Sequence, residues 1–252
     1  MSYYLDIGQG ETLVFIHGLG NRKEAWNDQL ELSKHFRLIV PDLRGHGEWN
    51  ESDDISVAQF AKDIIFLLNK LGIRKAHFCG ISLGGIIAQE IYKEFPERVS
   101  SLILSNTFSY SSCFLNTLFF QSQMRKIQSV DQETLHNASA KKCLYNQDDQ
   151  TLFEKTKNVF LIRKDVYKTT SLSSLRSNYL STLRKIDVPT LVIGSKEDKV
   201  VPYICSLQTH FLITGSEFHG FEKTGHLSNI EQKEEFNFLI RNFILKQRRR
   251  SA

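Results

Sequence analysis

Three polar residues far apart in the sequence could together cleave a carbonyl compound: Ser82, Asp198 and His226. A serine hydroxyl is a weak nucleophile unless an imidazole accepts its proton during attack. The imidazole in turn needs a carboxylate that holds its other N–H and stabilises the imidazolium. The chain order Ser, Asp, His is a known order for such a triad. We therefore expect Ser82 to be the nucleophile, His226 the general base and Asp198 its partner.

The surroundings of Ser82 favour this chemistry. The letters G-I-S-L-G at 80–84 match the pattern G-x-S-x-G, between an expected strand that ends at Cys79 and an expected helix that begins near Leu83. Glycines on both sides permit a very tight turn, and the helix N-terminus favours negative charge. An ordinary turn with a serine helix cap is the alternative, and the strand-turn-helix setting favours the nucleophile.

A second glycine-containing loop predicts an oxyanion hole. The letters H-G-L-G at 17–20 directly follow the apolar run at 13–16. Acyl transfer needs fixed donors where negative charge develops on the substrate oxygen. We expect these donors to be the backbone N–H groups of Leu19 and Leu83, and we expect His17 to brace the loop rather than react. The residues expected to contact the substrate are Gly18, Trp26, Phe108 and Phe119.

The base and its partner are chosen by position. His226 follows the last expected strand and precedes the last helix, so it falls at the same sheet edge as Ser82. The other seven histidines lie in expected turns, strands, helices or the insertion. Asp198 follows the apolar run 191–193 and reaches the same edge, and its neighbour Glu197 is the rival for this role.

Short apolar runs alternate with amphipathic stretches, which is typical of an α/β protein with a mostly parallel sheet and helices on both faces. Helical faces are predicted within 60–71, 87–95 and 236–243. The alternation stops between 106 and 185, which indicates a helical cap inserted between core segments 1–105 and 186–252. The expected strands are an edge strand within 3–7 and runs at 13–16, 38–40, 76–79, 102–104, 191–193 and 217–221.

Composition excludes several other classes of protein. There is no apolar run long enough to span a membrane and no secretory signal pattern, so we expect a cytoplasmic protein. Four scattered cysteines predict free thiols rather than disulfides or a zinc site. The net charge of +4 equals the charge of the basic tail residues within 246–250, so we expect no nucleic-acid partner.

Taken together, the motifs resemble those of the α/β-hydrolase superfamily over nearly the whole chain apart from 106–185. They are H-G-L-G at 17–20, P-D-L-R-G-H-G at 41–47, G-I-S-L-G-G at 80–85, P-E-R-V at 96–99, the Asp198 loop and G-H at 225–226. The resemblance implies an eight-stranded sheet, a helical cap, the triad above and a structural turn at 42–47. Serine rather than aspartate at position 82 argues against haloalkane dehalogenases and epoxide hydrolases. The most similar subgroups are small carboxylesterases, 3-oxoadipate enol-lactonases and pimeloyl-carrier-protein methyl esterases.

The reaction expected is hydrolysis of a small-molecule carboxylic ester, lactone or thioester through an acyl-enzyme, without a metal or organic cofactor. Two alternatives remain: hydrolysis of a carbon–carbon bond in a vinylogous diketone, and a non-enzymatic receptor on the same fold. The stretch 107–183 carries ten Lys/Arg against six Asp/Glu, which could receive an acidic acyl-carrier protein or a carboxylate substrate, although a solvated face is the commoner meaning. The physiological substrate, the acyl-chain preference and the oligomeric state are not predicted.

Overall fold

The computed structural model describes residues 3–110 and 129–251, in which seven strands form one sheet of order β1-β3-β2-β4-β5-β6-β7. β1 pairs antiparallel with β3, and every other pair is parallel. All seven expected strands are present, so the described sheet has one strand fewer than the resemblance implied. The strands are β1 (Tyr4–Ile7), β2 (Thr12–Ile16), β3 (Arg37–Pro41), β4 (Ala76–Ile81), β5 (Val99–Ser105), β6 (Thr190–Ser195) and β7 (Glu217–Phe221).

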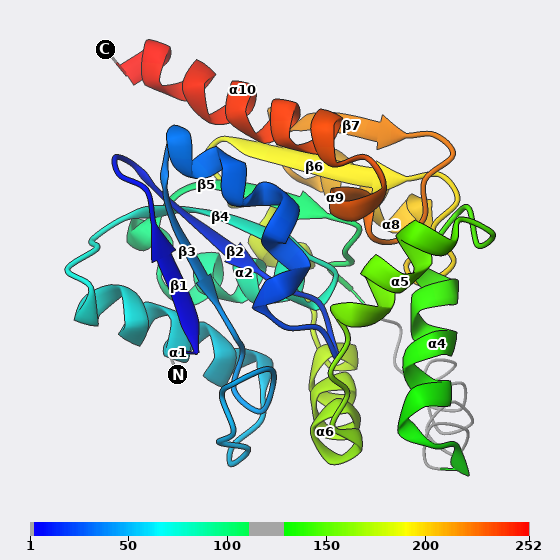
Figure 1. Cartoon of the computed structure of the whole chain (residues 1–252). Coiled ribbons are helices and arrows are strands. Elements are labelled where there is room, and N and C mark those ends of the chain that lie inside the picture. The colour runs from blue at the N-terminus through cyan, green and yellow to red at the C-terminus, as the bar shows by residue number, and fades with distance from the viewer. Residues whose placement is uncertain (1–2, 111–128, 252) are drawn as a thin grey trace.

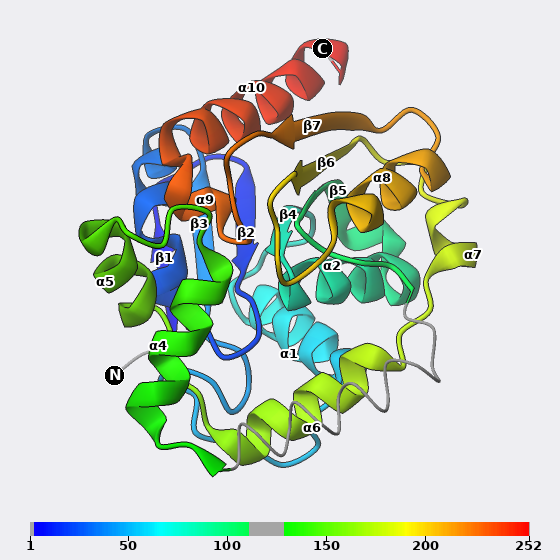
Figure 2. The same ribbon diagram turned by 90° about the vertical axis from the view of Figure 1, so that its right-hand side faces the viewer.

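Helices cover both faces of the sheet, which explains why its central strands are apolar on both sides. In β2, Leu13 and Phe15 join one core cluster while Val14 and Ile16 join the other. The first cluster is completed by η1 (Lys23–Lys34) and α10 (Lys233–Ser251), and the second by α1 (Val57–Lys70) and α2 (Leu83–Glu94). Figures 1 and 2 show α10 and α2 on opposite sides of the strands. The remaining helices outside the insertion are η2 (Pro96–Arg98), α8 (Tyr203–Leu212) and α9 (Ser228–Glu231).

The segment between β5 and β6 is helical wherever the structure describes it as regular. Its helices are α4 (Gln132–Cys143), α5 (Gln150–Asn158), α6 (Lys164–Leu175) and α7 (Leu180–Leu183). Figure 1 shows α4 and α5 beyond the arrowheads of β5, β6 and β7, which are the carboxyl ends of these strands. Parallel sheets bind ligands at that edge. The division into a core and a cap from 106 to 185 stays a prediction.

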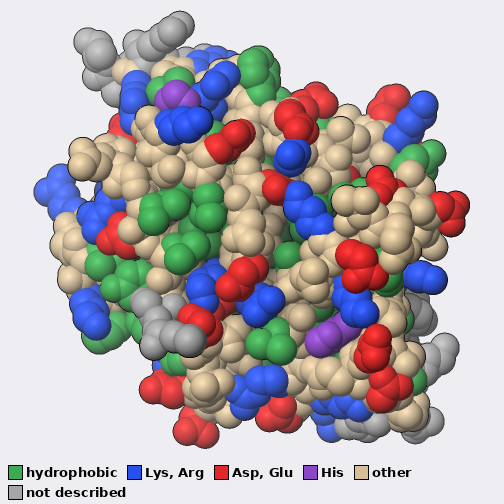
Figure 3. All heavy atoms as spheres, in the orientation of Figure 1, with side chains coloured by type: hydrophobic (Ala, Val, Ile, Leu, Met, Phe, Trp, Pro, Cys, Tyr) green, Lys and Arg blue, Asp and Glu red, His purple; other side chains and the backbone are tan. Residues whose placement is uncertain are grey.

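The surface carries charges of both signs (Figure 3), and the described cysteines form no disulfide. Figure 3 shows acidic and basic side chains interspersed over the face that it presents. Within 3–110 and 129–251, no helix is both long enough and apolar enough to cross a bilayer. Cys79, Cys143 and Cys205 are unpaired, while Cys113 lies outside the described residues.

Candidate active site

Ser82 occupies a strained turn between β4 and α2. Its φ of 56° and ψ of −118° lie in a region that residues with a side chain rarely adopt. Two hydrogen bonds hold it there: the Ser82 N–H donates to Ser105 O (2.9 Å), and Thr107 Oγ1 donates to Ser82 O (2.7 Å). Strain of this kind, held by neighbouring hydrogen bonds, is typical of a nucleophile presented above a sheet.

Glycines make the turn possible because backbone segments meet there. A Cβ built on Gly80 would lie 2.2 Å from the carbonyl carbon of Gly84, and one on Gly84 would lie 2.0 Å from the carbonyl oxygen of Ile16. Neither neighbour is a flexible side chain that could move away. The G-x-S-x-G glycines are therefore required by packing between β4, α2 and β2.

Replacing Gly84 by alanine is expected to destabilise the protein by about 2 to 4 kcal/mol, because the new methyl group meets fixed backbone atoms. The matched control is Gly72→Ala, at a position with φ of 69° and no atom within 4 Å of the added Cβ. At Gly72 only the strained backbone conformation should destabilise the variant, by about 1 kcal/mol. Urea unfolding of the two variants measures the difference, and equal midpoints would contradict the packing argument.

The H-G-L-G loop lies directly beside the nucleophile. A Cβ on Gly18 would lie 3.5 Å from Cβ of Ser82. Among the described residues, the backbone N–H groups of Leu19 and Leu83 donate to no protein acceptor. Leu83 is also the first residue of α2, where the helix leaves its N–H groups unpaired. The role of these two N–H groups as oxyanion donors stays a prediction.

His17 links this loop to the next one, which is the bracing role expected from the sequence. The N–H of Leu43 donates to His17 Nε2 (3.0 Å), so the ring proton is on Nδ1, which donates to Gly18 O (2.8 Å). Complete burial lowers the pKa of His17, which keeps the ring neutral. The turn after β3 is fixed in turn by Asp42, which accepts hydrogen bonds from the N–H groups of Lys23 (2.7 Å) and Glu48 (2.9 Å).

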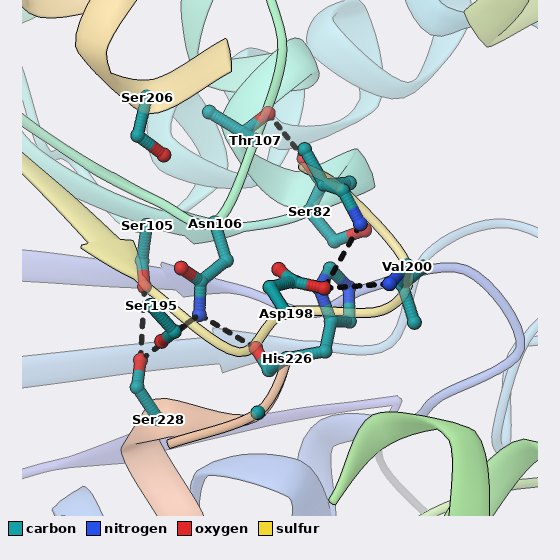
Figure 4. A network of polar contacts seen from close by, with 12 residues as sticks. Ser82, Ser105, Asn106, Thr107, Ser195, Asp198, Val200, Ser206, His226 and Ser228 are labelled. Carbon is teal, nitrogen blue, oxygen red and sulfur yellow. Dashed lines mark hydrogen bonds and ion pairs between the residues drawn. The ribbon is translucent and has the colours of Figure 1, made fainter. Parts of the chain in front are cut away.

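Asp198 and His226 form a buried pair. His226 Nδ1 lies 2.7 Å from Asp198 Oδ2, and both side chains are almost fully buried (Figure 4). A carboxylate only accepts, so Nδ1 carries the proton and Nε2 keeps a free lone pair. The other oxygen of Asp198 accepts from the N–H groups of Val200 (2.7 Å) and Val201 (2.9 Å), which fixes the carboxylate. Glu197, the rival for this role, accepts instead from the N–H of Thr224 (3.0 Å).

Asn106 was not predicted from the sequence as a site residue, although its segment connects the Ser82 turn to the His226 loop. Its Nδ2 donates to the carbonyl oxygen of His226 (2.7 Å) and to Ser195 Oγ (3.0 Å). The next residue, Thr107, donates to Ser82 O, so one short segment after β5 touches both the serine turn and the histidine loop (Figure 4). A positive φ of 44° at Asn106 is the local signal, since asparagine tolerates this conformation better than most residues.

The structure therefore brings Ser82, Asp198 and His226 to the same end of the sheet, after β4, β6 and β7 respectively. The Ser82 hydroxyl and the ring of His226, which both lie within the described residues, form no hydrogen bond with each other. Such bonds are often long in unliganded enzymes and shorten when substrate binds.

The expected substrate contacts have different outcomes. Gly18 lies against Ser82, and Phe108 packs partly buried against the core cluster of α1 and α2. Trp26 differs from its expected place: it is 0% exposed, and its ring packs 4.6 Å from that of Phe15 between η1 and the sheet. An indole on this inner face of η1 fills the core rather than lining a substrate pocket. Phe119 lies outside the described residues.

Among the residues that the structure describes, no group of three or more His, Cys, Asp or Glu side chains is arranged to hold a metal ion.

The chain belongs to the α/β-hydrolase fold family, whose family model matches residues 11–233. A curated relative from Pseudomonas sp, a 2-hydroxy-6-oxononadienedioate/2-hydroxy-6-oxononatrienedioate hydrolase, is 26% identical over 96% of this chain and 90% of its own. A thermophilic esterase from Thermogutta terrifontis matches with a TM-score of 0.88 at 24% identity, over 96% of this chain and 92% of that one. The enol-lactonase from Burkholderia xenovorans LB400 matches with a TM-score of 0.87 at 23% identity, over 96% and 95%.

Proposed function

We propose that the protein is a serine hydrolase that cleaves a carboxylic ester or lactone through an acyl-enzyme formed on Ser82. The observation that carries this proposal is the 2.7 Å pair of His226 and Asp198 at the sheet end where Ser82 is held with positive φ. That pair fixes the imidazole through Nδ1 and leaves Nε2 as the atom that can accept a proton.

The reaction follows from these positions. Ser82 Oγ attacks the carbonyl carbon as His226 Nε2 takes the hydroxyl proton. The carbonyl oxygen becomes an oxyanion, which accepts hydrogen bonds from the N–H groups of Leu19 and Leu83. The tetrahedral intermediate collapses, the carbon–oxygen bond breaks, and His226 gives its proton to the leaving alcohol. A water molecule, deprotonated by His226, then releases the acid and restores Ser82.

The helices between β5 and β6 act in this proposal as a cap over the site. The carbonyl oxygen of Gly20, the last residue of the H-G-L-G loop, accepts a hydrogen bond from the N–H of Leu161 (2.8 Å). The ring of Tyr167 from α6 lies within 3.3 Å of a Cβ built on the same glycine. Contacts of the insertion with this loop support a role in substrate selection.

Hydrolysis of a carbon–carbon bond is the second candidate, because the Pseudomonas relative carries the name of a hydrolase for a nine-carbon oxo-dicarboxylate. The same triad would serve, with a carbanion equivalent rather than an alcohol as the leaving group. A dicarboxylate would also need cationic side chains near the site, whereas a neutral ester would not.

A substrate panel is expected to separate the two reactions. Assays would compare p-nitrophenyl esters of increasing chain length, an enol-lactone and a ring-cleavage diketone acid at equal concentration. We expect multiple turnovers on an ester or the lactone, with kcat/KM at least tenfold above that on the diketone. Turnover of the diketone without turnover of the esters would select carbon–carbon hydrolysis. A single stoichiometric acylation without turnover would instead indicate a receptor.

A further inference from the structure

The loop that carries His226 is in direct backbone contact with the end of α4. The N–H of His226 donates to the carbonyl oxygen of Cys143 (2.7 Å). A Cβ built on Gly225 would lie 2.3 Å from that same oxygen and 2.7 Å from the backbone nitrogen of Tyr145. The stretch 143–145 and the stretch 225–226 thus leave no room for a side chain between them.

The carboxylate of Glu231, at the end of α9, joins these two stretches. Its Oε1 accepts from the N–H of Gly225 (2.7 Å), and its Oε2 accepts from the N–H of Tyr145 (2.9 Å). Each of its oxygens therefore holds a different segment, one in the histidine loop and one in the insertion. Charge-assisted bonds of this length are stronger than neutral ones.

We propose that Glu231 is a positioning residue that sets the insertion and the His226 loop in one fixed register. This inference rests on the proposed function, in which His226 is the base and the insertion covers the substrate. Because the two contacts share one carboxylate, any shift of residue 145 is transmitted to Gly225 and to the histidine that follows it. The position of the cap and the position of the base are thereby coupled.

The environment of Glu231 makes this coupling sensitive to pH. Burial, and to a smaller extent the negative charge of Asp198, raise the pKa of Glu231 to about 7, although the two N–H bonds and His226 oppose the rise. The other titratable group facing it is Cys143 of α4, beside the charged Lys142. The hydroxyl oxygen of a protonated carboxyl is a poor acceptor, so one of the two N–H bonds should weaken as the pH falls through about 7.

Protonation of Glu231 raises the global stability of the fold but weakens the contacts that position the two segments. The folded pKa lies above the ordinary value of 4.5. The stability gained by protonating Glu231 is therefore complete below about pH 4.5 and is lost as the pH rises through about 7. The ionised carboxylate of Glu231, with its bonds to Gly225 and Tyr145, forms a clamp between the two segments. This clamp lowers the global stability of the fold.

Amide hydrogen exchange tests the clamp. In the full-length Glu231→Gln variant, the amide oxygen can accept one N–H but the NH₂ group cannot accept the other. Protection of the amide of Gly225 or Tyr145 should therefore fall at least tenfold. In the wild type, protection at these amides, corrected for intrinsic exchange, should fall between pH 8 and pH 6, and in Glu231→Gln it should not change. The matched control is Glu234→Gln in α10, where the side chain of Glu234 is 81% exposed and pairs with Lys233.

Turnover provides the second readout, on whichever ester the panel identifies. Glu231→Gln should lower kcat at least tenfold with a smaller change in KM, while Glu234→Gln should leave both unchanged. The proposal would be overturned if both amides of the Glu231→Gln variant kept the protection they have in the wild type. It would also be overturned if the variant lost this protection but kept the wild-type kcat. If the variant does not fold, the pH dependence of wild-type exchange decides, and pH-independent protection would overturn it. A wild-type chain without any turnover would refute the proposed function, while the exchange data would still decide the clamp.

Discussion

The Ser82→Ala variant is expected to lose turnover by a factor on the order of a million while keeping its fold. In the proposed mechanism, alanine leaves no atom that can form the acyl-enzyme, and the oxyanion donors alone would give only a small residual rate. The Ser82 N–H donates to Ser105 O, and the Ser82 carbonyl oxygen accepts from Thr107 Oγ1. Neither bond involves the Ser82 hydroxyl, so the turn should stay in place. Steady-state kinetics on the best ester, with burst-phase measurement of acylation, checks this.

Stability separates the loss of chemistry from the loss of structure in this variant. The serine hydroxyl makes no hydrogen bond to a described residue, so the unfolding midpoint of Ser82→Ala should match that of the wild type. Activity within tenfold of the wild type would assign the nucleophile elsewhere. A large loss of stability would mean that the hydroxyl has a structural role.

The Asp198→Asn variant is expected to lower kcat about ten-thousandfold near neutral pH. An amide that presents its NH₂ group to His226 Nδ1 places the ring proton on Nε2, where it can no longer accept the proton of Ser82. The 2.7 Å contact and the two N–H groups of Val200 and Val201 make this reversal specific to Asp198. The pH profile of kcat measures the loss.

The control for Asp198 is its neighbour in sequence. Glu197→Gln removes the charge of a carboxylate that accepts from Thr224 rather than from the histidine. We expect less than a tenfold loss of kcat from this change. If Glu197→Gln proved the more damaging of the two, the assignment of the acid would have to be reversed.

The central strands were predictable because they are buried on both faces. A strand such as Leu13–Ile16 must be apolar at every position, and this run stands out between polar loops. Even β7, a half-buried strand with polar residues, could be placed from its position before the last helix. The eighth strand was implied by the resemblance alone, and the described residues form a sheet of seven strands.

The candidate site was predictable only where its residues follow strands. Ser82, Asp198 and His226 each follow a strand end, so the topology of a parallel sheet brings them to one edge. Asn106 and Glu231 act through backbone groups of segments distant in sequence, and no spacing rule predicts such contacts. Trp26 was expected to contact the substrate, whereas the structure buries it with Ala25 and Leu32 on the inner face of η1.

Labelling with a fluorophosphonate, followed by peptide mapping, tests the central assignment most directly. We expect a single covalent adduct on Ser82 in the wild type, formed at least a thousandfold more slowly in His226→Ala. An adduct on another residue, or an equal rate of labelling in the two proteins, would contradict the catalytic assignment.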